Sequence, residues 1–168
     1  LIGCLCSLLE PTAGRVIYEG APLPEVTNRY RGRIGVVLEG NRNVYWYMSA
    51  LDNLRYFGRL SYLDEGTITR KSEELLRFFG LWEVRHEAVG TFSRGMQQKV
   101  AIGVAFLNSP ELLFLDEPSI GLDVIAKRQL VDQLRHLSRE KKTTVLLTSH
   151  QLDVVDQLPE VEKILFYN

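Results

Sequence analysis

A short apolar run that ends in two adjacent acids constrains this chain more than any other feature. The run is Leu112-Leu113-Phe114-Leu115, and Asp116-Glu117-Pro118 follows it directly. A continuous apolar run of this length is typical of a strand buried on both faces, as in a parallel sheet. Open α/β sheets bind ligands beyond the carboxyl ends of their strands. The run therefore predicts an α/β fold that delivers both acids to a ligand-binding edge.

The two acids suit two different tasks. Adjacent residues of a strand point to opposite sides, so Asp116 and Glu117 need not act on the same group. One carboxylate can hold a metal ion while the other acts on a water molecule, which is the arrangement used in phosphoryl transfer.

The rest of the chain supplies the other elements of such a sheet. Further strands are predicted at residues 15–18, 34–38, 143–148 and 161–167, and helices at residues 1–9, 95–108, 124–140 and 152–157. Alternating strands and helices favour a parallel sheet covered by helices. Residues 21–31 are polar, contain Pro22 and Pro24, and are predicted to form a surface loop.

Residues 41–90 have a helical pattern instead. Ser49 is expected to cap one helix, and Thr67 to cap a second helix that ends at Gly80. Aromatic side chains gather in this segment. They either pack as the core of a small helical subdomain, or form, near Tyr45 and Trp46, an exposed groove for another protein.

Composition limits the possible partners. The 168 residues suffice for one domain, and their net charge of −1 gives no indication of a nucleic-acid partner. The longest apolar runs are too short for a membrane span, so any membrane contact requires a partner. Cys4 and Cys6 lie two residues apart on an apolar segment and are expected to be reduced structural thiols.

Four motifs, in order, resemble the ATPase domain of ABC transporters over nearly the whole chain. Phe92-Ser93-Arg94-Gly95-Met96-Gln97 resembles the signature motif, and residues 112–117 resemble the Walker B strand. Residues 119–123 resemble the D-loop, and His150 the switch histidine. The resemblance implies a P-loop NTPase-like, three-layer, mostly parallel sheet with an inserted helical subdomain. It divides the chain into a core of residues 1–40 and 109–168 and a helical subdomain of residues 41–108.

The resemblance also implies a role for each site residue, with ATP and Mg²⁺ as cofactors. Asp116 would hold Mg²⁺, Glu117 would act as the base for the attacking water, and His150 would contact the γ-phosphate. Ser93, Gly95 and Met96 begin a helix whose free N–H groups would bind the γ-phosphate of ATP on the opposite subunit. Asp123 would lie at the dimer contact, although a helix N-cap requires the same residue type.

Two departures from the family pattern concern the site itself. Glu39 stands where the family has a glutamine that contacts Mg²⁺ and water, and Arg94 stands where the signature has glycine. An acid at position 39 can still ligate Mg²⁺ or orient water, but it adds negative charge near the phosphates.

A third departure concerns the phosphate-binding loop. No glycine in the chain is followed by lysine, so the Walker A motif is absent from these residues. Because residue 1 is not Met and residues 1–9 match the helix that follows that loop, we expect an N-terminally truncated domain. Such a fragment lacks the loop and the adenine-stacking strands, and it should be inactive alone.

The resemblance implies an ATP-hydrolysing transporter subunit at the cytoplasmic face of the membrane. It would work as a homodimer or heterodimer bound to integral membrane permease subunits. Residues 43–46 and 52–54 resemble the bacterial subgroup that exports drugs, antibiotics or polysaccharides, and the permease would dock near Glu39, Tyr45 and Trp46. The alternatives are a soluble ABC ATPase of DNA repair or translation, and a non-catalytic interaction module.

Overall fold

The computed structural model describes residues 1–40 and 43–149. The described elements, in chain order, are α1 Ile2–Leu5, β1 Ile17–Tyr18, β2 Ala21–Pro22, α2 Leu23–Arg31, β3 Ile34–Val37, α3 Ala50–Leu60, α4 Glu65–Phe78, the 3-10 helix η1 Val89–Thr91, α5 Arg94–Phe106, β4 Leu112–Asp116, α6 Val124–Lys141 and β5 Thr144–Thr148. The predicted elements after His150 lie outside the described residues.

The central sheet has the order β3-β4-β5, and both of its strand pairs are parallel. This confirms the parallel sheet predicted from the sequence. In register, Val37 lies beside Leu115, and Asp116 lies beside Thr148. The carboxyl ends of all three strands therefore meet at one edge, which holds the two acids.

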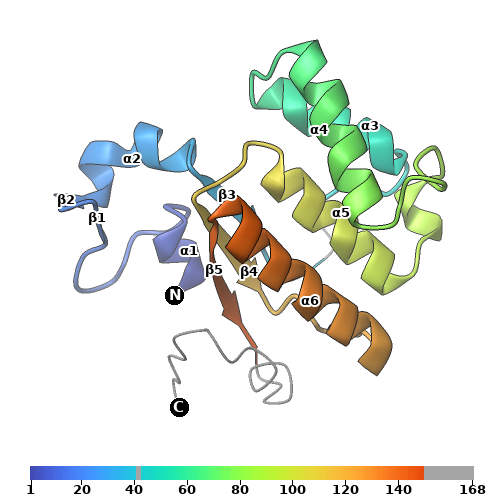
Figure 1. Cartoon of the computed structure of the whole chain (residues 1–168). Coiled ribbons are helices and arrows are strands. Elements are labelled where there is room, and N and C mark those ends of the chain that lie inside the picture. Colours follow the sequence, from blue (N-terminus) through green and yellow to red (C-terminus); the bar gives the residue numbers. More distant parts are fainter. Residues whose placement is uncertain (41–42, 150–168) are drawn as a thin grey trace.

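The alternation of side chains along the strands divides the core into two faces. Val37, Leu113 and Leu115 pack with buried residues of α5 and α6, whereas Phe114 packs with buried residues of α1 and α2. Figure 1 shows the long α6 lying across the sheet, with α1 and α2 at the opposite end of the molecule from α3 and α4. Full burial of a leucine or phenylalanine contributes about 1.5–3 kcal/mol, so each face stabilises the sheet substantially.

Helix α5 approaches the sheet very closely at Gly35. A Cβ atom added to Gly35 would lie 2.4 Å from the carbonyl oxygen of Ala105, a distance that no side chain tolerates. Any larger residue at position 35 would push α5 away from β3. Since α5 also packs against α3 and α4, this contact joins the helical part of the chain to the sheet.

Helix caps fix where four of the helices begin. Ser49, Asp64, Ser93 and Asp123 each accept a hydrogen bond from a backbone N–H in the first turn of the helix that follows. The expected cap at Ser49 is confirmed. The expected cap at Thr67 is wrong, because Asp64 caps this helix and Thr67 donates the N–H that Asp64 accepts.

The prediction of a surface loop at residues 21–31 is also wrong. Ala21 and Pro22 pair with β1 in a hairpin, and the following residues form α2. Proline is tolerated in the first helical turn because its missing N–H would have no partner there, so Pro24 begins this helix rather than breaking it. Leu23 and Tyr30 are buried against the sheet, and the Tyr30 hydroxyl donates to the carbonyl of Leu5 at 2.6 Å.

The first helix is shorter than residues 1–9. It ends at Leu5, and Ser7 adopts a positive φ of 57° that turns the chain away. Leu8 and Leu9 are exposed and lie outside the helix. The prediction of a helix through residue 9 was too long because it relied on their apolar character.

Candidate functional site

Asp116 and Glu117 lie where β4 leaves the sheet. Asp116 is the last residue of the strand, and its Oδ1 accepts a hydrogen bond from the Thr148 hydroxyl at 2.7 Å. Glu117 adopts a φ of 50°, in the left-handed region that residues other than glycine rarely occupy. Its backbone N–H donates to the same Thr148 hydroxyl at 3.1 Å. The two acids are thus held on a turn with a defined and unusual backbone geometry.

A hollow of about 200 Å³ lies in front of these acids. Its lining brings together Glu39, Asp116 and Glu117, which come from the ends of two neighbouring strands. Helix α5 contributes Arg94, Gln97, Gln98 and Ala101. The segment after β3 contributes Leu38, Gly40, Asn43, Val44 and Trp46, and the turn after β4 contributes Ile120. The hollow therefore combines three carboxylates with one guanidinium, a set that suits a ligand carrying both a cation and anionic groups.

The segment after β3 is held in place by Asn43. The Asn43 side chain accepts from the N–H of Leu38 at 3.1 Å and donates to the carbonyls of Leu38 and Gly40 at 2.7 and 3.1 Å. These bonds close the chain around Glu39, whose side chain is exposed at the hollow.

The start of α5 holds the signature residues. Ser93 is exposed, and its hydroxyl accepts from the N–H of Met96 at 3.3 Å, so it acts as a helix cap. A Cβ atom at Gly95 would lie 3.3 Å from the Cβ of Ala126, so glycine here allows α5 and α6 to pack closely at their first turns. Ser93, Gly95 and Met96 do not line the described hollow, and their expected action on a second subunit remains a prediction.

Asp123 caps α6, accepting from the N–H of Ala126 at 2.8 Å. The next two side chains, Val124 and Ile125, are 73% and 72% exposed. The capping role that the sequence indicated is confirmed, whereas the dimer contact stays a prediction. His150, the predicted γ-phosphate contact, lies outside the described residues.

The donor set at the hollow fits Mg²⁺ of the kind that accompanies a nucleotide. Within residues 1–40 and 43–149, no group of three or more His, Cys, Asp or Glu side chains could hold a metal by itself. Mg²⁺ does not require such a cage, because it keeps several waters and binds through one or two carboxylates together with substrate phosphates. Asp116 would be one such carboxylate, and Glu39 lines the same hollow.

Cys6 belongs to the buried cluster around Phe114, on the α1 and α2 face of the sheet. Burial raises the pKa of the Cys6 thiol to about 11, and the negative charge of Asp116 acts in the same direction. Neither Cys4 nor Cys6 forms a disulfide. Cys6 therefore remains a protonated, structural thiol at neutral pH.

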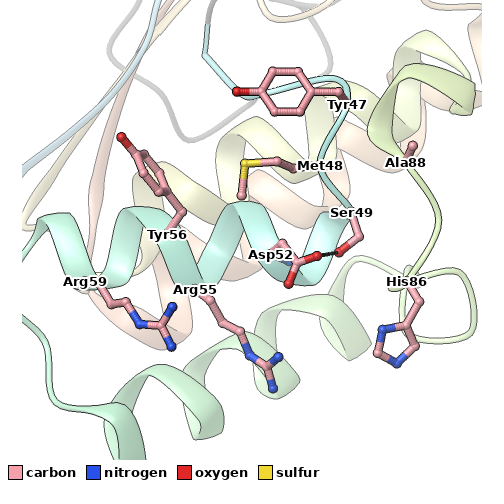
Figure 2. Close-up of a pocket in the computed structure, with 9 residues that line it drawn as sticks. All are labelled: Tyr47, Met48, Ser49, Asp52, Arg55, Tyr56, Arg59, His86 and Ala88. Carbon is pink, nitrogen blue, oxygen red and sulfur yellow. Dashed lines mark hydrogen bonds between the residues drawn. The ribbon is translucent and has the colours of Figure 1, made fainter.

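A second hollow, of about 460 Å³, lies along α3. Figure 2 shows Arg55 and Arg59 extending from one side of α3 and Tyr56 from the other, with Tyr47 and His86 on the flanking loops. Two aromatic side chains are exposed here, since Tyr47 is 80% and Tyr56 40% exposed. The predicted groove was placed near Tyr45 and Trp46, which are 37% and 41% exposed, and Trp46 lines the hollow of the acids together with Glu39.

Two residues near the acids were not predicted as site residues, namely Gln97, which lines the hollow, and Thr148, which donates to Asp116. Arg94 and Gln97 lie on α5, and only the tertiary fold brings them to the end of β4. Thr148 carried a signal that could have been used, because a hydroxyl at the end of the neighbouring strand can reach the acid beside it.

No helix among the described residues has the length and hydropathy that crossing a membrane requires.

Comparison with known sequences identifies related proteins. The family described as "ABC transporter" matches residues 1–120. The chain is 36% identical to the ABC transporter ATP-binding protein NatA of Bacillus subtilis, over 94% of this chain and 64% of that protein. It is 34% identical to the Nod factor export ATP-binding protein I of Cupriavidus pinatubonensis, over 92% of this chain and 47% of that protein. The chain thus spans about half to two thirds of the length of these relatives.

Solved structures agree on the fold. The chain matches cbiO1 from Clostridium perfringens, part of the ABC transporter complex cbiONQ, with a TM-score of 0.82 and 23% identity, covering 93% of this chain and 63% of that one. It also matches a dimeric ATP-binding cassette in a post-hydrolysis state bound to ADP and Pi, with a TM-score of 0.77 and 24% identity, covering 91% and 69%. These likenesses confirm the predicted α/β fold.

Proposed function

Because this chain belongs to the ABC transporter family, we propose that it forms part of an ATP-hydrolysing subunit that powers export through separate membrane subunits. The observation that carries the proposal is the hollow where Glu39, Asp116 and Glu117 meet at the carboxyl edge of the sheet. Relatives named for Nod factor export and for daunorubicin resistance support an export direction. The transported compound would be a small molecule, a drug or a polysaccharide.

Each residue has a role in this proposal. Asp116, together with Glu39, would hold Mg²⁺, which would neutralise charge on the phosphates. Glu117 would accept the proton of the attacking water, and its left-handed backbone conformation lies directly after the end of β4. His150 would donate a hydrogen bond to the γ-phosphate as negative charge shifts during the reaction.

A second subunit would complete the site. Ser93, Gly95 and Met96 would contribute N–H groups of the α5 N-terminus to ATP held by the partner, and Asp123 would lie at the contact between the two subunits. The exposed Val124 and Ile125 beside Asp123 support this, because burial of two such side chains stabilises an interface. The division into a core and a helical subdomain of residues 41–108 is part of the same proposal.

The test compares two glutamate substitutions at opposite ends of β4. In the full-length protein, Glu117→Gln should lower ATP turnover with Mg²⁺ by about 100-fold or more, as expected for loss of a general base. Glu111→Gln is the matched control, since Glu111 is exposed and lies at the other edge of the sheet. Turnover by the unmodified protein that does not exceed that of Glu117→Gln would exclude ATP hydrolysis at this site.

The 168 residues alone should bind ATP weakly. They contain neither the glycine-rich loop nor the lysine that would hold the β- and γ-phosphates. We expect a Kd above about 1 mM by calorimetry, corresponding to less than about 4 kcal/mol of binding free energy.

A further inference from the structure

Thr148 makes two hydrogen bonds that connect the two acids. Its hydroxyl donates to Oδ1 of Asp116 at 2.7 Å and accepts from the backbone N–H of Glu117 at 3.1 Å. The register of the sheet places Thr148 directly beside Asp116, so β5 presents the hydroxyl to both groups at once. A hydroxyl is suited to this place because it can donate and accept simultaneously.

We propose that Thr148 is a positioning residue that sets the orientation of the Asp116 carboxylate and the backbone turn at Glu117. This inference rests on the proposed function for the tasks of the two acids, while the geometry is independent of it. Residues that act through a metal-binding side chain change metal affinity about 10–100-fold when they are mutated. Thr148 should therefore influence metal binding without contacting the metal.

The bond to Asp116 limits how its carboxylate can turn. With Oδ1 held by Thr148, Oδ2 is left for a ligand in the hollow. Both side chains are partly buried, where a hydrogen bond is stronger than in water. Without the hydroxyl, the carboxylate could rotate about its side-chain bonds and would bind a cation less well.

The bond to Glu117 stabilises a strained conformation. Left-handed backbone at a residue other than glycine is costly and persists only where its surroundings enforce it. The Thr148 hydroxyl accepts the N–H that this turn directs toward β5. One side chain thus fixes both the acid proposed to hold Mg²⁺ and the acid proposed to activate water.

The test measures metal binding rather than turnover. Full-length protein carrying Glu117→Gln, which should hydrolyse ATP very slowly, is saturated with ATP and titrated with Mn²⁺, and free Mn²⁺ is followed by electron paramagnetic resonance. Thr148→Val, which keeps the side-chain shape and removes the hydroxyl, should raise the Mn²⁺ Kd at least about tenfold. Thr148→Ser keeps the hydroxyl and should stay within about threefold of the parent.

Thr143→Val is the matched control for a lost hydroxyl. The buried Thr143 hydroxyl donates to the carbonyl of Pro110 at 2.8 Å, at the opposite edge of the sheet from the acids. Thr143→Val should lower the thermal midpoint but leave the Mn²⁺ Kd unchanged. If Thr148→Val does not fold, Thr148→Ala removes the same hydroxyl and carries the same comparison.

Three results would overturn the inference. They are an unchanged Mn²⁺ Kd on loss of the Thr148 hydroxyl, an equal rise with Thr143→Val, and an equal rise with Thr148→Ser. A parent protein that binds no Mn²⁺ with ATP would instead count against the proposed function, and the purpose assigned to Thr148 would fall with it.

Discussion

Asn53 is completely buried, and its side-chain amide is fully used. Its Oδ1 accepts from the N–H of Tyr45 at 2.7 Å, and its Nδ2 donates to the carbonyls of Tyr45 and Ser49, each at 2.9 Å. Within this segment, Trp46 lines the first hollow, and Tyr47, Met48 and Ser49 line the second. Asn53 therefore holds a stretch of backbone that contributes to both hollows.

Asn53→Asp should therefore be strongly destabilising. The substitution keeps the shape but replaces two donor hydrogens by an acidic oxygen that faces two carbonyls. We expect a loss of about 2 kcal/mol or more in the free energy of unfolding, measured by urea denaturation. Asn28→Asp, at an exposed site on α2, should change it by less than about 0.5 kcal/mol. Equal effects at the two positions would contradict the role given to Asn53.

At the level of single residues, the sequence could identify chemistry but not choose between two roles. Ser93 is predicted to act at a nucleotide site, and Asp123 is predicted to lie at a dimer contact or to cap a helix. Both are caps in the structure, and a cap uses the same oxygen atom and helix N-terminus that a phosphate site would require. The second role requires groups that belong to another subunit.

Asp64 shows how an element boundary depends on charge. Its carboxylate accepts from the N–H of Thr67 at 2.9 Å at the start of α4. This backbone hydrogen bond holds the pKa of Asp64 below its ordinary value. Because the folded pKa is lowered, the stabilising contribution is complete above the ordinary pKa and is lost as the pH falls through the folded pKa.

Asp64→Asn should flatten the acid side of the stability profile. Asparagine still caps the helix but does not titrate, so the variant should lose less stability than the unmodified protein between pH 5 and pH 2, measured by thermal unfolding. Asp132→Asn, in the middle of α6, removes an acid that caps no helix and serves as the control. Profiles of the same steepness for Asp64→Asn and the unmodified protein would exclude this contribution.

Elements with one strong pattern were predicted almost to the residue. The apolar run became β4, and the spaced apolar residues of 124–140 became α6, which buries Leu130, Val131, Leu134 and Leu137. The errors came at residues 21–31 and 1–9, where local signals conflicted. Pro24 can break or begin a helix, and only the burial of Leu23 and Tyr30 against the sheet decides between these outcomes.

At the scale of the whole molecule, the sequence could predict those parts of the site that lie at the carboxyl ends of strands. Asp116 and Glu39 follow neighbouring strands, so a parallel sheet brings them to one edge. The approach of α5 could not be read from the sequence, because it depends on packing between segments that are distant in the chain. This approach places Arg94 in the same hollow as Glu39. Glu39 and Arg94, which both depart from the family pattern, therefore line the same hollow, where the positive charge of Arg94 moderates the negative charge of Glu39.

The hollow along α3 gives the molecule a second surface with its own charge. Arg55, Arg59 and His86 line it together with a single acid, Asp52. Asp52 accepts from the Ser49 hydroxyl at 2.7 Å, and Arg59 pairs with Glu65 at 2.6 Å. Within the part of the chain that the structure describes, Arg55 makes no hydrogen bond or ion pair. The permease is predicted to dock near Glu39, Tyr45 and Trp46, and a permease segment that extends from there into this neighbouring hollow should carry an acidic side chain beside apolar ones that meet Tyr47 and Tyr56.

Arg55→Glu should weaken binding of the membrane subunit. The reversal places a carboxylate opposite the acid expected on the partner, and like charges at an interface cost enough to lower affinity about tenfold or more. The measurement is the amount of membrane subunit that copurifies with the full-length protein as salt is raised. Arg70→Glu makes the same change on the exposed side of α4, outside this hollow, and should retain the partner. If the two variants retain equal amounts, the permease does not use the charge of this hollow, and docking must depend on another face of the helical part.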